Sequence, residues 1–162
     1  MAGQKWKKLW EKEAKEKFRS FIKDYLTNFP QGCFGLVEKG ELVGAMFLTK
    51  TLELKPIPYL HEFSDYFEED GKIAYVSLFC AKRGKYQEEI AQNLYDEAEK
   101  VAFLKLKCKT IAVVIYSSPI ELRALQSHNY EKLDRQFEWE IYPDKIVPCW
   151  IYYYDLLFEE SG

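Results

Sequence analysis

The feature that most constrains the fold of this sequence is a strand–helix–strand pattern in its middle. Ile73–Cys80 and Thr110–Tyr116 are nearly continuous apolar runs, as expected of strands that are buried on both faces. Between them, Glu88–Leu106 repeats apolar residues at three- and four-residue steps, which is typical of an amphipathic helix. Because this order and spacing form a βαβ unit, we expect two parallel strands joined by a right-handed crossover.

Antiparallel pairs are predicted on both sides of this unit. Upstream, Cys33–Val37 and Leu42–Leu54 flank the short polar turn Glu38–Glu41, which is a hairpin pattern. Downstream, a short helix capped by Ser117-Ser118-Pro119 precedes a second antiparallel pair; the expected elements are helix Ile120–Ser127, strand Leu133–Ile141, turn Tyr142–Lys145 and strand Pro148–Leu157. The predicted fold class is α+β, with a mixed central sheet that combines antiparallel hairpins and one parallel βαβ crossover.

The N-terminal segment is predicted to be one long amphipathic helix. From Gln4 to about Asn28, aromatic and aliphatic side chains recur at helical spacing, and Phe29-Pro30-Gln31-Gly32 ends the pattern. The segment is rich in Lys, so it either packs on its own sheet or binds an acidic partner. Since no linker or repeat interrupts the chain, we expect a single domain over residues 1–162, with an N-terminal helix (1–28) and a core (33–157).

The composition narrows the class of protein. The net charge of -3 gives no basic surface for nucleic acid. No apolar run reaches membrane-spanning length, and the charged N-terminus lacks the apolar core of a signal peptide, so we expect a cytoplasmic protein with no membrane association. The 4 cysteines are far apart and the chain has only 2 histidines, which argues against a zinc site and against a disulfide framework.

A long segment, Lys55–Lys72, separates the hairpin from the βαβ unit. Connections of this length within a compact domain often carry functional residues. The segment contains His61, Glu62 and Asp65, which are candidate proton acceptors, and histidine titrates near neutral pH. An ordinary solvated loop explains the same residues, so both interpretations stay open at this point.

The segment Val76–Glu89, VSLFCAKRGKYQEE, joins the first strand of the βαβ unit to its helix. Over nearly all of Cys33–Leu157, the order of elements resembles the GNAT superfamily of acyl-CoA N-acyltransferases. In that family the turn has the form Arg/Gln-x-x-Gly-x-Gly/Ala, and it binds the pyrophosphate of acetyl-CoA on backbone N–H groups. Here Arg83-Gly84-Lys85 matches the opening of the motif, whereas Tyr86 and Glu88 occupy the two positions that are small in the family.

The resemblance implies a set of residues that bind acetyl-CoA. Backbone groups of the strand would position the pantetheine arm, the turn would hold the phosphates, and a serine takes the place of a common Asn at the next helix. The set consists of Leu78, Phe79, Cys80, Arg83, Gly84, Lys85, Tyr86, Gln87 and Ser118. The carboxylates of Glu88 and Glu89 would either repel phosphate or simply complement the helix dipole.

The family's usual proton donor is missing from this sequence. Many relatives carry a Tyr that protonates the departing CoA thiolate, followed five residues later by an aromatic residue. When that aromatic residue is aligned with Tyr130, Leu125 falls at the position of the Tyr. The nearest substitutes by sequence position are Tyr116 and His128, while His61 and Glu62 are the candidate bases. Cys80 ends its strand near the expected thioester, although a lone cysteine there more often packs as a small apolar residue. No metal site is expected.

Two functional hypotheses follow from these residues. The first is an acyl-CoA-dependent N-acyltransferase that passes an acetyl group directly to an amine of a small molecule or a peptide. The second is a non-catalytic GNAT-like domain that senses acyl-CoA or binds another protein. The aromatic run Trp150–Tyr154 is compatible with core packing, with a groove for an apolar or cationic substrate, and with a homodimer contact.

Overall fold

The structure, a computed structural model, describes residues 16, 19–20, 22–50, 72–115, 118–142 and 145–156. Residues 22–28 are helical and precede the remaining elements. These elements are, in chain order, the 3-10 helix η1 (Pro30–Gly32), strands β1 (Cys33–Glu38), β2 (Glu41–Thr49) and β3 (Ile73–Ala81), helix α2 (Gln87–Lys100), the π-helical turn η3 (Val101–Lys105), strand β4 (Thr110–Ile115), helix α3 (Pro119–Ser127), and strands β5 (Glu131–Tyr142) and β6 (Lys145–Asp155).

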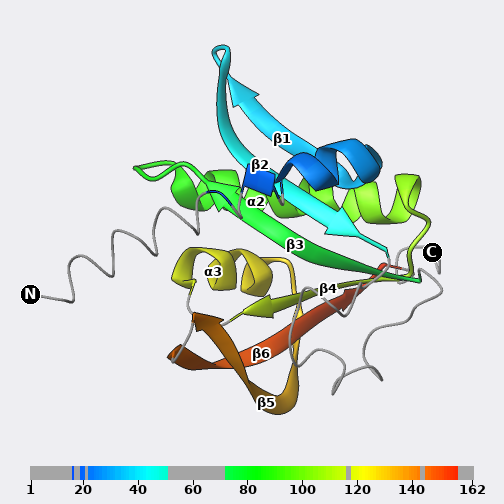
Figure 1. Ribbon diagram of the computed structural model, residues 1–162, viewed down its shortest axis with the longest axis vertical. Helices are drawn as coiled ribbons and strands as arrows, with labels where there is room; N and C mark the ends of the chain where they lie inside the picture. Colours follow the sequence, from blue (N-terminus) through cyan, green and yellow to red (C-terminus); the bar gives the residue numbers. More distant parts are fainter. Residues whose placement is uncertain are drawn as a thin grey trace, which may run out of the picture.

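The strands form one mixed sheet in the order β1-β2-β3-β4-β6-β5 (Figure 1). Strands β3 and β4 are parallel, and every other neighbouring pair is antiparallel. Helix α2 connects the two parallel strands. The predicted α+β class, with two antiparallel hairpins around one βαβ unit, is therefore confirmed.

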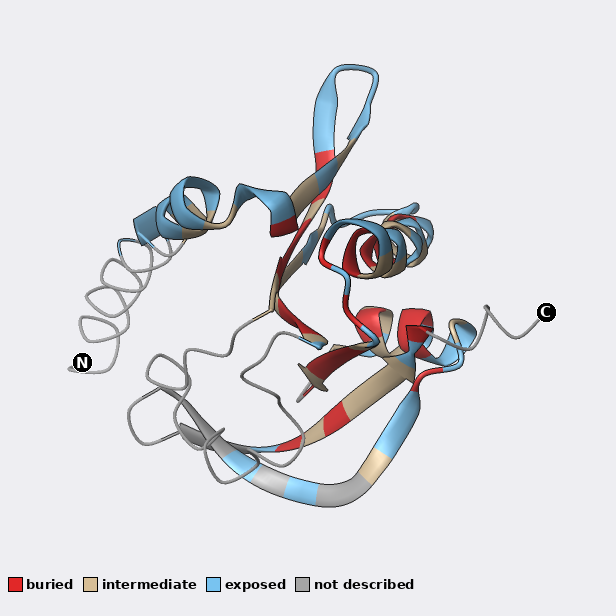
Figure 2. Cartoon of the chain, turned by 90° about the vertical axis from the view of Figure 1, so that its right-hand side faces the viewer, coloured by how far each residue is buried: buried red, intermediate tan, exposed pale blue. Residues whose placement is uncertain are grey.

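Helices cover both faces of this sheet (Figure 2). Helices α2 and α3 lie side by side on one face, where Ile111, Val113 and Ile115 of β4 join their buried cluster. The helix at residues 22–28 lies on the opposite face, where the ring of Tyr25 stacks on Phe47 of β2 at 5.6 Å between centroids. The alternation of side chains along each strand thus supplies two apolar layers.

Some boundaries differ from the expected ones. The crossover helix is α-helical only to Lys100, because Val101–Lys105 continues it as a π-helical turn. The last strand begins at Lys145 and contains Pro148. Pro148 lies opposite Glu138 of β5, and among the described residues the pairing of β6 with β4 runs from Trp150 onward. Residues 1–15, 51–54, Tyr116 and Leu157, which fall in predicted elements, lie outside the described residues.

The aromatic run Trp150–Tyr154 lies in β6, between β4 and β5. Ile151 is buried, and the ring of Tyr154 stacks on Tyr130 at 5.3 Å between centroids. The ammonium of Lys132 lies 4.8 Å from the centroid of Trp150. These contacts within the chain support core packing as the role of the run. Among the described residues, no helix combines the length and apolar character needed to span a bilayer.

Gly44 of β2 permits α2 to approach the sheet closely. A Cβ atom there would lie 2.8 Å from Ile90 Cγ2 and 3.0 Å from Leu94 Cδ1. We therefore expect Gly44→Val to lower the free energy of unfolding by roughly 1–3 kcal/mol, because extra carbon in a packed core displaces its neighbours. Urea denaturation measures the change. The matched control is Val37→Ala, at a side chain 64% exposed, which should change stability by less than about 0.5 kcal/mol; equal effects would contradict the prediction.

Candidate functional site

An opening between β3 and β4 is the main irregularity of the sheet. The two strands pair over only three positions, from Ile73↔Thr110 to Tyr75↔Ala112. Beyond that point β3 stays bonded to β2 as far as Ala81, while its other edge has no ladder partner within the described chain. Because backbone N–H and C=O groups need hydrogen-bond partners, the stretch Val76–Ala81 offers a row of them to an extended ligand.

A β-bulge explains why β3 departs from β4. The register between β2 and β3 shifts at Phe47/Leu48, whose partners are Leu78 and Val76, so Ser77 has no partner in β2. An extra residue of this kind bends its strand and increases the local twist. The hydroxyl of Ser77 donates to the carbonyl of Phe47 at 3.2 Å and holds the bulge in place.

The turn that follows β3 leads into the start of α2. Gly84 adopts a φ of 140°, which favours a residue without a side chain. The side chain of Gln87 donates to the carbonyl of Ala81 at 3.2 Å and ties the turn back to β3. No side chain caps α2, because its N-cap residue is Tyr86 and makes no capping hydrogen bond. The N–H of Gln87 donates to the carbonyl of Gly84 at 3.3 Å, so within the described chain the next N–H groups, those of Glu88 and Glu89, remain available to an anion.

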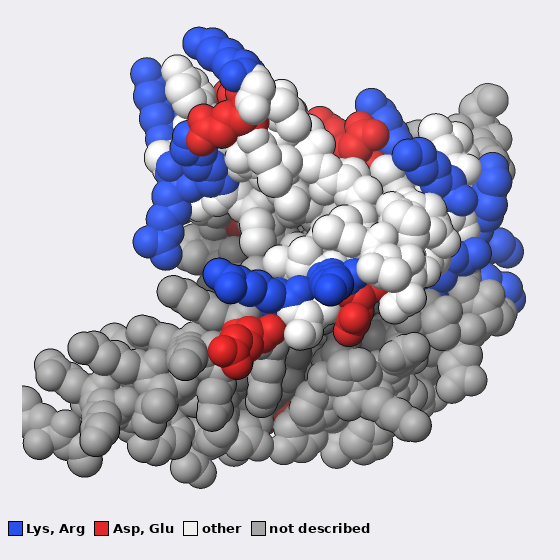
Figure 3. All heavy atoms as spheres, turned by 45° about the horizontal axis from the view of Figure 1, so that its top comes forward, with Lys and Arg blue, Asp and Glu red and all other residues white. Residues whose placement is uncertain are grey.

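Basic side chains surround this turn. They line a pocket of about 400 Å³ between the β1–β2 hairpin and the turn, formed by Glu38, Lys39, Glu41, Val43, Lys82, Arg83, Gly84, Lys85, Tyr86 and Ile90. The ammonium of Lys82 pairs with Glu41 at 2.7 Å, and that of Lys85 lies 5.5 Å from the centroid of Tyr86. Figure 3 shows Lys and Arg side chains at both edges and across the middle of this face of the molecule, with Asp and Glu side chains among them.

Solved structures share the fold of this chain. An acetyltransferase of the GNAT family from Streptococcus pneumoniae matches with a TM-score of 0.59 at 10% identity, over 86% of this chain and 75% of its own. The chain has the GNAT fold. At these identities the likeness concerns the fold, and the sequence itself matches no protein-family model and no curated protein. The predicted GNAT-like architecture is confirmed.

Two further similar structures contain a CoA ligand. The yncA protein of Salmonella typhimurium, solved with its cofactor acetyl-CoA, has a TM-score of 0.60 at 12% identity and covers 85% of this chain and 73% of its own. A GNAT-like decarboxylase in complex with isobutyryl-CoA has a TM-score of 0.66 at 13% identity and covers 85% of both chains. Proteins with the GNAT fold therefore include acyl-CoA binders of more than one reaction class.

Glu88 and Tyr86, which depart from the GNAT turn motif, adopt defined places. The carboxylate of Glu88 pairs with the guanidinium of Arg123 on α3 at 3.3 Å, and the two side chains are 47% and 53% exposed. The pair is worth little in stability because it is half-solvated. It does place a positive charge beside the Glu88 carboxylate at the start of α2. Tyr86 is 56% exposed, so its ring extends away from the core.

Helix α3 and its N-cap contain Ser118 and Leu125, the two positions that the resemblance singled out after β4. Ser118 is the N-cap residue of α3, where its carbonyl accepts from Leu122 N–H at 2.9 Å and its hydroxyl makes no capping hydrogen bond. Leu125 is fully buried in the core and cannot donate a proton. The other candidates in the predicted set, His61, Glu62 and Tyr116, together with Asp65, lie outside the described residues.

His128 lies at the other end of α2 from the turn. Its Nδ1 is 3.2 Å from Glu99 and its Nε2 is 3.4 Å from Asp96. The hydrogen bond to Glu99 raises the pKa of His128 above its ordinary value, against the opposing effect of burial. Since α2 rises 1.5 Å per residue, these carboxylates lie about 12–16 Å along the helix from Glu88. The imidazole therefore links α2 to α3 away from the turn, and its ring lies 6.3 Å from that of Tyr95.

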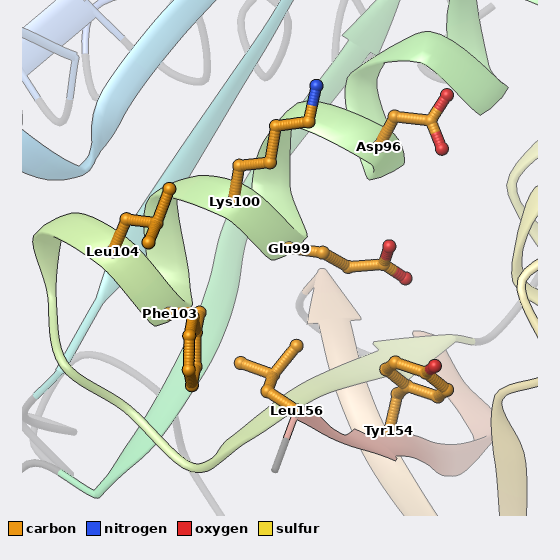
Figure 4. Close-up of a pocket in the computed structure, with 7 residues that line it drawn as sticks. All are labelled: Asp96, Glu99, Lys100, Phe103, Leu104, Tyr154 and Leu156. Atoms are coloured by element: carbon orange, nitrogen blue, oxygen red, sulfur yellow. The ribbon is translucent and has the colours of Figure 1, made fainter. Parts of the chain in front are cut away.

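Asp96, Glu99 and His128 could offer three ligand atoms to a metal, since these atoms lie within 4.8 Å of one another. Both ring nitrogens already face a carboxylate, so the ion pairs account for the cluster. Next to it lies a pocket of about 500 Å³, in which Glu99 extends from α2 toward the side where Tyr154 lies (Figure 4). Apolar groups of Phe103, Leu104 and Leu156 line much of its remaining wall.

A buried pair between α2 and α3 was missed by the sequence reasoning. The hydroxyl of Tyr95 donates to Oε1 of Glu121 at 2.5 Å. Glu121 is 8% exposed and Tyr95 is fully buried. Burial raises the pKa of Glu121 to about 7, and the hydrogen bond from Tyr95 offsets part of this. The available signal was position: Glu121 precedes Leu125 by one helical turn and so lies on the buried face of α3.

Proposed function

We propose that this chain is a divergent GNAT N-acyltransferase, which binds an acyl-CoA and passes its acyl group, acetyl in the simplest case, to an amine of a small molecule or a peptide. The observation that carries the proposal is the open edge of β3 beside an uncapped helix start. An extended amide-containing arm can pair with such an edge, and phosphates can bind at such a helix end. The CoA-bound structures of the same fold support this assignment.

Each part of the opening has a chemical task in this proposal. Backbone groups of Leu78, Phe79 and Cys80 would hold the pantetheine arm and polarise the thioester carbonyl, because N–H groups stabilise a developing negative oxygen. Arg83 and Lys85 would supply charge-assisted hydrogen bonds to the phosphates. These roles use the backbone path and the charges of the turn, so they do not require small residues at Tyr86 and Glu88.

The second candidate is a non-catalytic domain that binds acyl-CoA as a sensor. It is favoured by Leu125, which is fully buried at the position where many relatives carry a proton donor. Binding and turnover separate the two candidates. A sensor would bind acetyl-CoA with no release of free thiol in the presence of any amine.

Calorimetry with acetyl-CoA tests both candidates on the 162-residue chain. We expect measurable heat of binding and a rise in melting temperature, because a ligand that binds only the folded state stabilises it. Release of CoA thiol is then followed with a panel of small amines and peptide N-termini. No heat and no thermal shift at millimolar acetyl-CoA would overturn the proposal. Binding without thiol release would favour the sensor.

A further inference from the structure

The Tyr95–Glu121 pair lies against the open stretch of β3. The ring of Tyr95 is 5.8 Å from that of Phe79, which belongs to this stretch. The neighbouring thiol of Cys80 has its pKa raised by burial and, secondly, by the negative charge of Glu121. Tyr95 comes from α2, the helix that follows β3, and Glu121 comes from α3, the helix that follows β4. The pair therefore joins the two elements that flank the opening.

A carboxyl group in this position is unusual on structural grounds alone. Burying a carboxylate without a cation is costly. Within the described part of the chain, Glu121 has a single hydrogen-bond partner, Tyr95, and contacts no Lys or Arg; the nearby guanidinium of Arg123 pairs with Glu88 instead. A glutamine would accept the same hydrogen bond with no such cost. Burial in this place therefore favours the protonated form of the Glu121 carboxyl.

The described titratable groups around this pair come from β3, α2 and the end of α3, where the ring of His128 lies 6.3 Å from that of Tyr95. Tyr75 and Cys80 from β3 and Tyr95 from α2 are the titratable groups that interact with Glu121. Tyr95 in turn contacts Tyr130, just before β5, at 5.6 Å between ring centroids. Tyr75, Cys80, Tyr95 and Tyr130 are weak acids that are neutral at pH 7, and both ring nitrogens of His128 face carboxylates of α2. Burial therefore governs the protonation of Glu121, and its pKa of about 7 suits an acid that must exchange its proton near neutral pH.

We infer that Glu121 is the general acid of the acyl transfer, and that Tyr95 is its positioning residue. The inference rests on the proposed function. The hydroxyl of Tyr95 occupies Oε1, which leaves Oε2 to carry the proton. Glu121 thus takes over, from the preceding turn of α3, the role for which Leu125 has no suitable group.

The step balances in atoms and charge. The amine nitrogen attacks the thioester carbonyl, so a C–N bond forms and the C–S bond breaks, with its electron pair going to sulfur. Glu121 gives its proton to that sulfur, which leaves as the CoA thiol. The acceptor nitrogen loses one proton as it becomes an amide, and this proton returns to the Glu121 carboxylate. No oxidant, metal or further reactant is needed.

The variant Glu121→Gln tests the inference, because it keeps the shape of the side chain and an oxygen that can accept from Tyr95. We expect its dissociation constant for acetyl-CoA to stay within about 2-fold of the wild type, since a neutral amide replaces a neutral acid of the same shape. Its kcat should fall by about 10²–10⁴-fold, the usual contribution of general acid catalysis. Gln126→Ala, an exposed change on the same helix, is the matched control and should leave kcat unchanged.

A pH profile separates catalysis from mere support of the helices. In the wild type, kcat should fall as pH rises through the pKa of Glu121. This descending limb of the pH–kcat profile should vanish in Glu121→Gln. In Tyr95→Phe the limb should move to higher pH, because the hydrogen bond from Tyr95 lowers the pKa of Glu121. A loss of packing alone would not move the limb.

The outcomes distinguish this inference from the proposed function. If the wild type turns over and Glu121→Gln keeps its rate within about 3-fold and the same pH limb, general acid catalysis by Glu121 is overturned while the acyltransferase stands, because such a change is well below the usual contribution. If the wild type binds acetyl-CoA without turnover, Glu121 has no catalytic role and the sensor is favoured. If the wild type does not bind acetyl-CoA, the proposed function fails first.

Discussion

Glutamine in place of Glu121 is expected to remove most of the pH dependence of stability between pH 4.5 and 6.5. The pKa of this carboxyl is raised from 4.5 to about 7 by burial in the folded protein. The folded chain therefore keeps a proton that the unfolded chain has released. The resulting stability is fully present below pH 4.5 and is lost as pH rises through 7. The difference between the two pKa values corresponds to about 3 kcal/mol of the free energy of unfolding.

Urea denaturation at pH 4.5, 5.5 and 6.5 measures this prediction. The free energy of unfolding of the wild type should fall over this range, whereas that of Glu121→Gln should stay nearly level. Glu138→Gln, at an exposed carboxylate of β5, is the control and should run parallel to the wild type. Parallel curves for all three proteins would show that Glu121 titrates as an ordinary exposed carboxyl, contrary to its burial.

The titration of His128 also lowers the free energy of unfolding as pH rises, but at higher pH than that of Glu121. Its pKa is raised first by the hydrogen bond to Glu99, so its contribution is fully present below its ordinary pKa of 6.5 and is lost as pH rises through the raised value. We therefore expect the free energy of unfolding of Glu121→Gln to keep falling with pH above pH 6.5. Confining the comparison to lower pH isolates Glu121.

Charge reversal at the turn, Arg83→Glu with Lys85→Glu, is expected to weaken acetyl-CoA binding by at least about 100-fold. Each charge-assisted hydrogen bond contributes roughly 1.5–3 kcal/mol, and each 1.4 kcal/mol changes affinity about tenfold. The new carboxylates would also repel the phosphates. Both side chains are exposed, so folding should be unaffected, and calorimetry on the folded variant measures the loss.

A matched control separates a local effect from a general change of charge. Lys109→Glu lies at the opposite end of the βαβ unit, because the N–H of Lys109 bonds to the carbonyl of Lys72 at the start of β3. We expect its affinity for acetyl-CoA to change by less than about 3-fold at physiological salt, since charges more than a Debye length from the phosphates are largely screened. Unchanged binding in the double variant would place the phosphates elsewhere.

Local patterns were sufficient to predict the order of the elements. The apolar runs Ile73–Cys80 and Thr110–Tyr116, with an amphipathic helix between them, could form little other than a βαβ unit, and the polar turn Glu38–Glu41 pointed to a hairpin. Boundaries were less accurate where neighbours decide them. Pro148 was predicted as the start of the last strand, yet β6 begins at Lys145, because the residues before the proline pair with the distant strand β5.

The candidate site divides in the same way. Arg83, Gly84 and Lys85 were found from sequence because a turn motif is contiguous in the chain. The opening beside them depends on a bulge at Ser77, which exists only relative to the register of β2, about 30 residues away in the chain. The Tyr95–Glu121 pair depends on two helix faces that meet only after α2 and α3 pack together.

Hydrophobic periodicity and turn chemistry act over a few residues, and they are legible in this chain without its structure. They determine a mixed sheet with one parallel crossover and a basic turn at its end. The splay of β3 from β4, the partner of Glu88 and the burial of Glu121 arise from contacts between distant segments. These contacts set the local dielectric and the available hydrogen-bond partners, and those two quantities decide what a backbone edge can bind and which carboxyl keeps its proton.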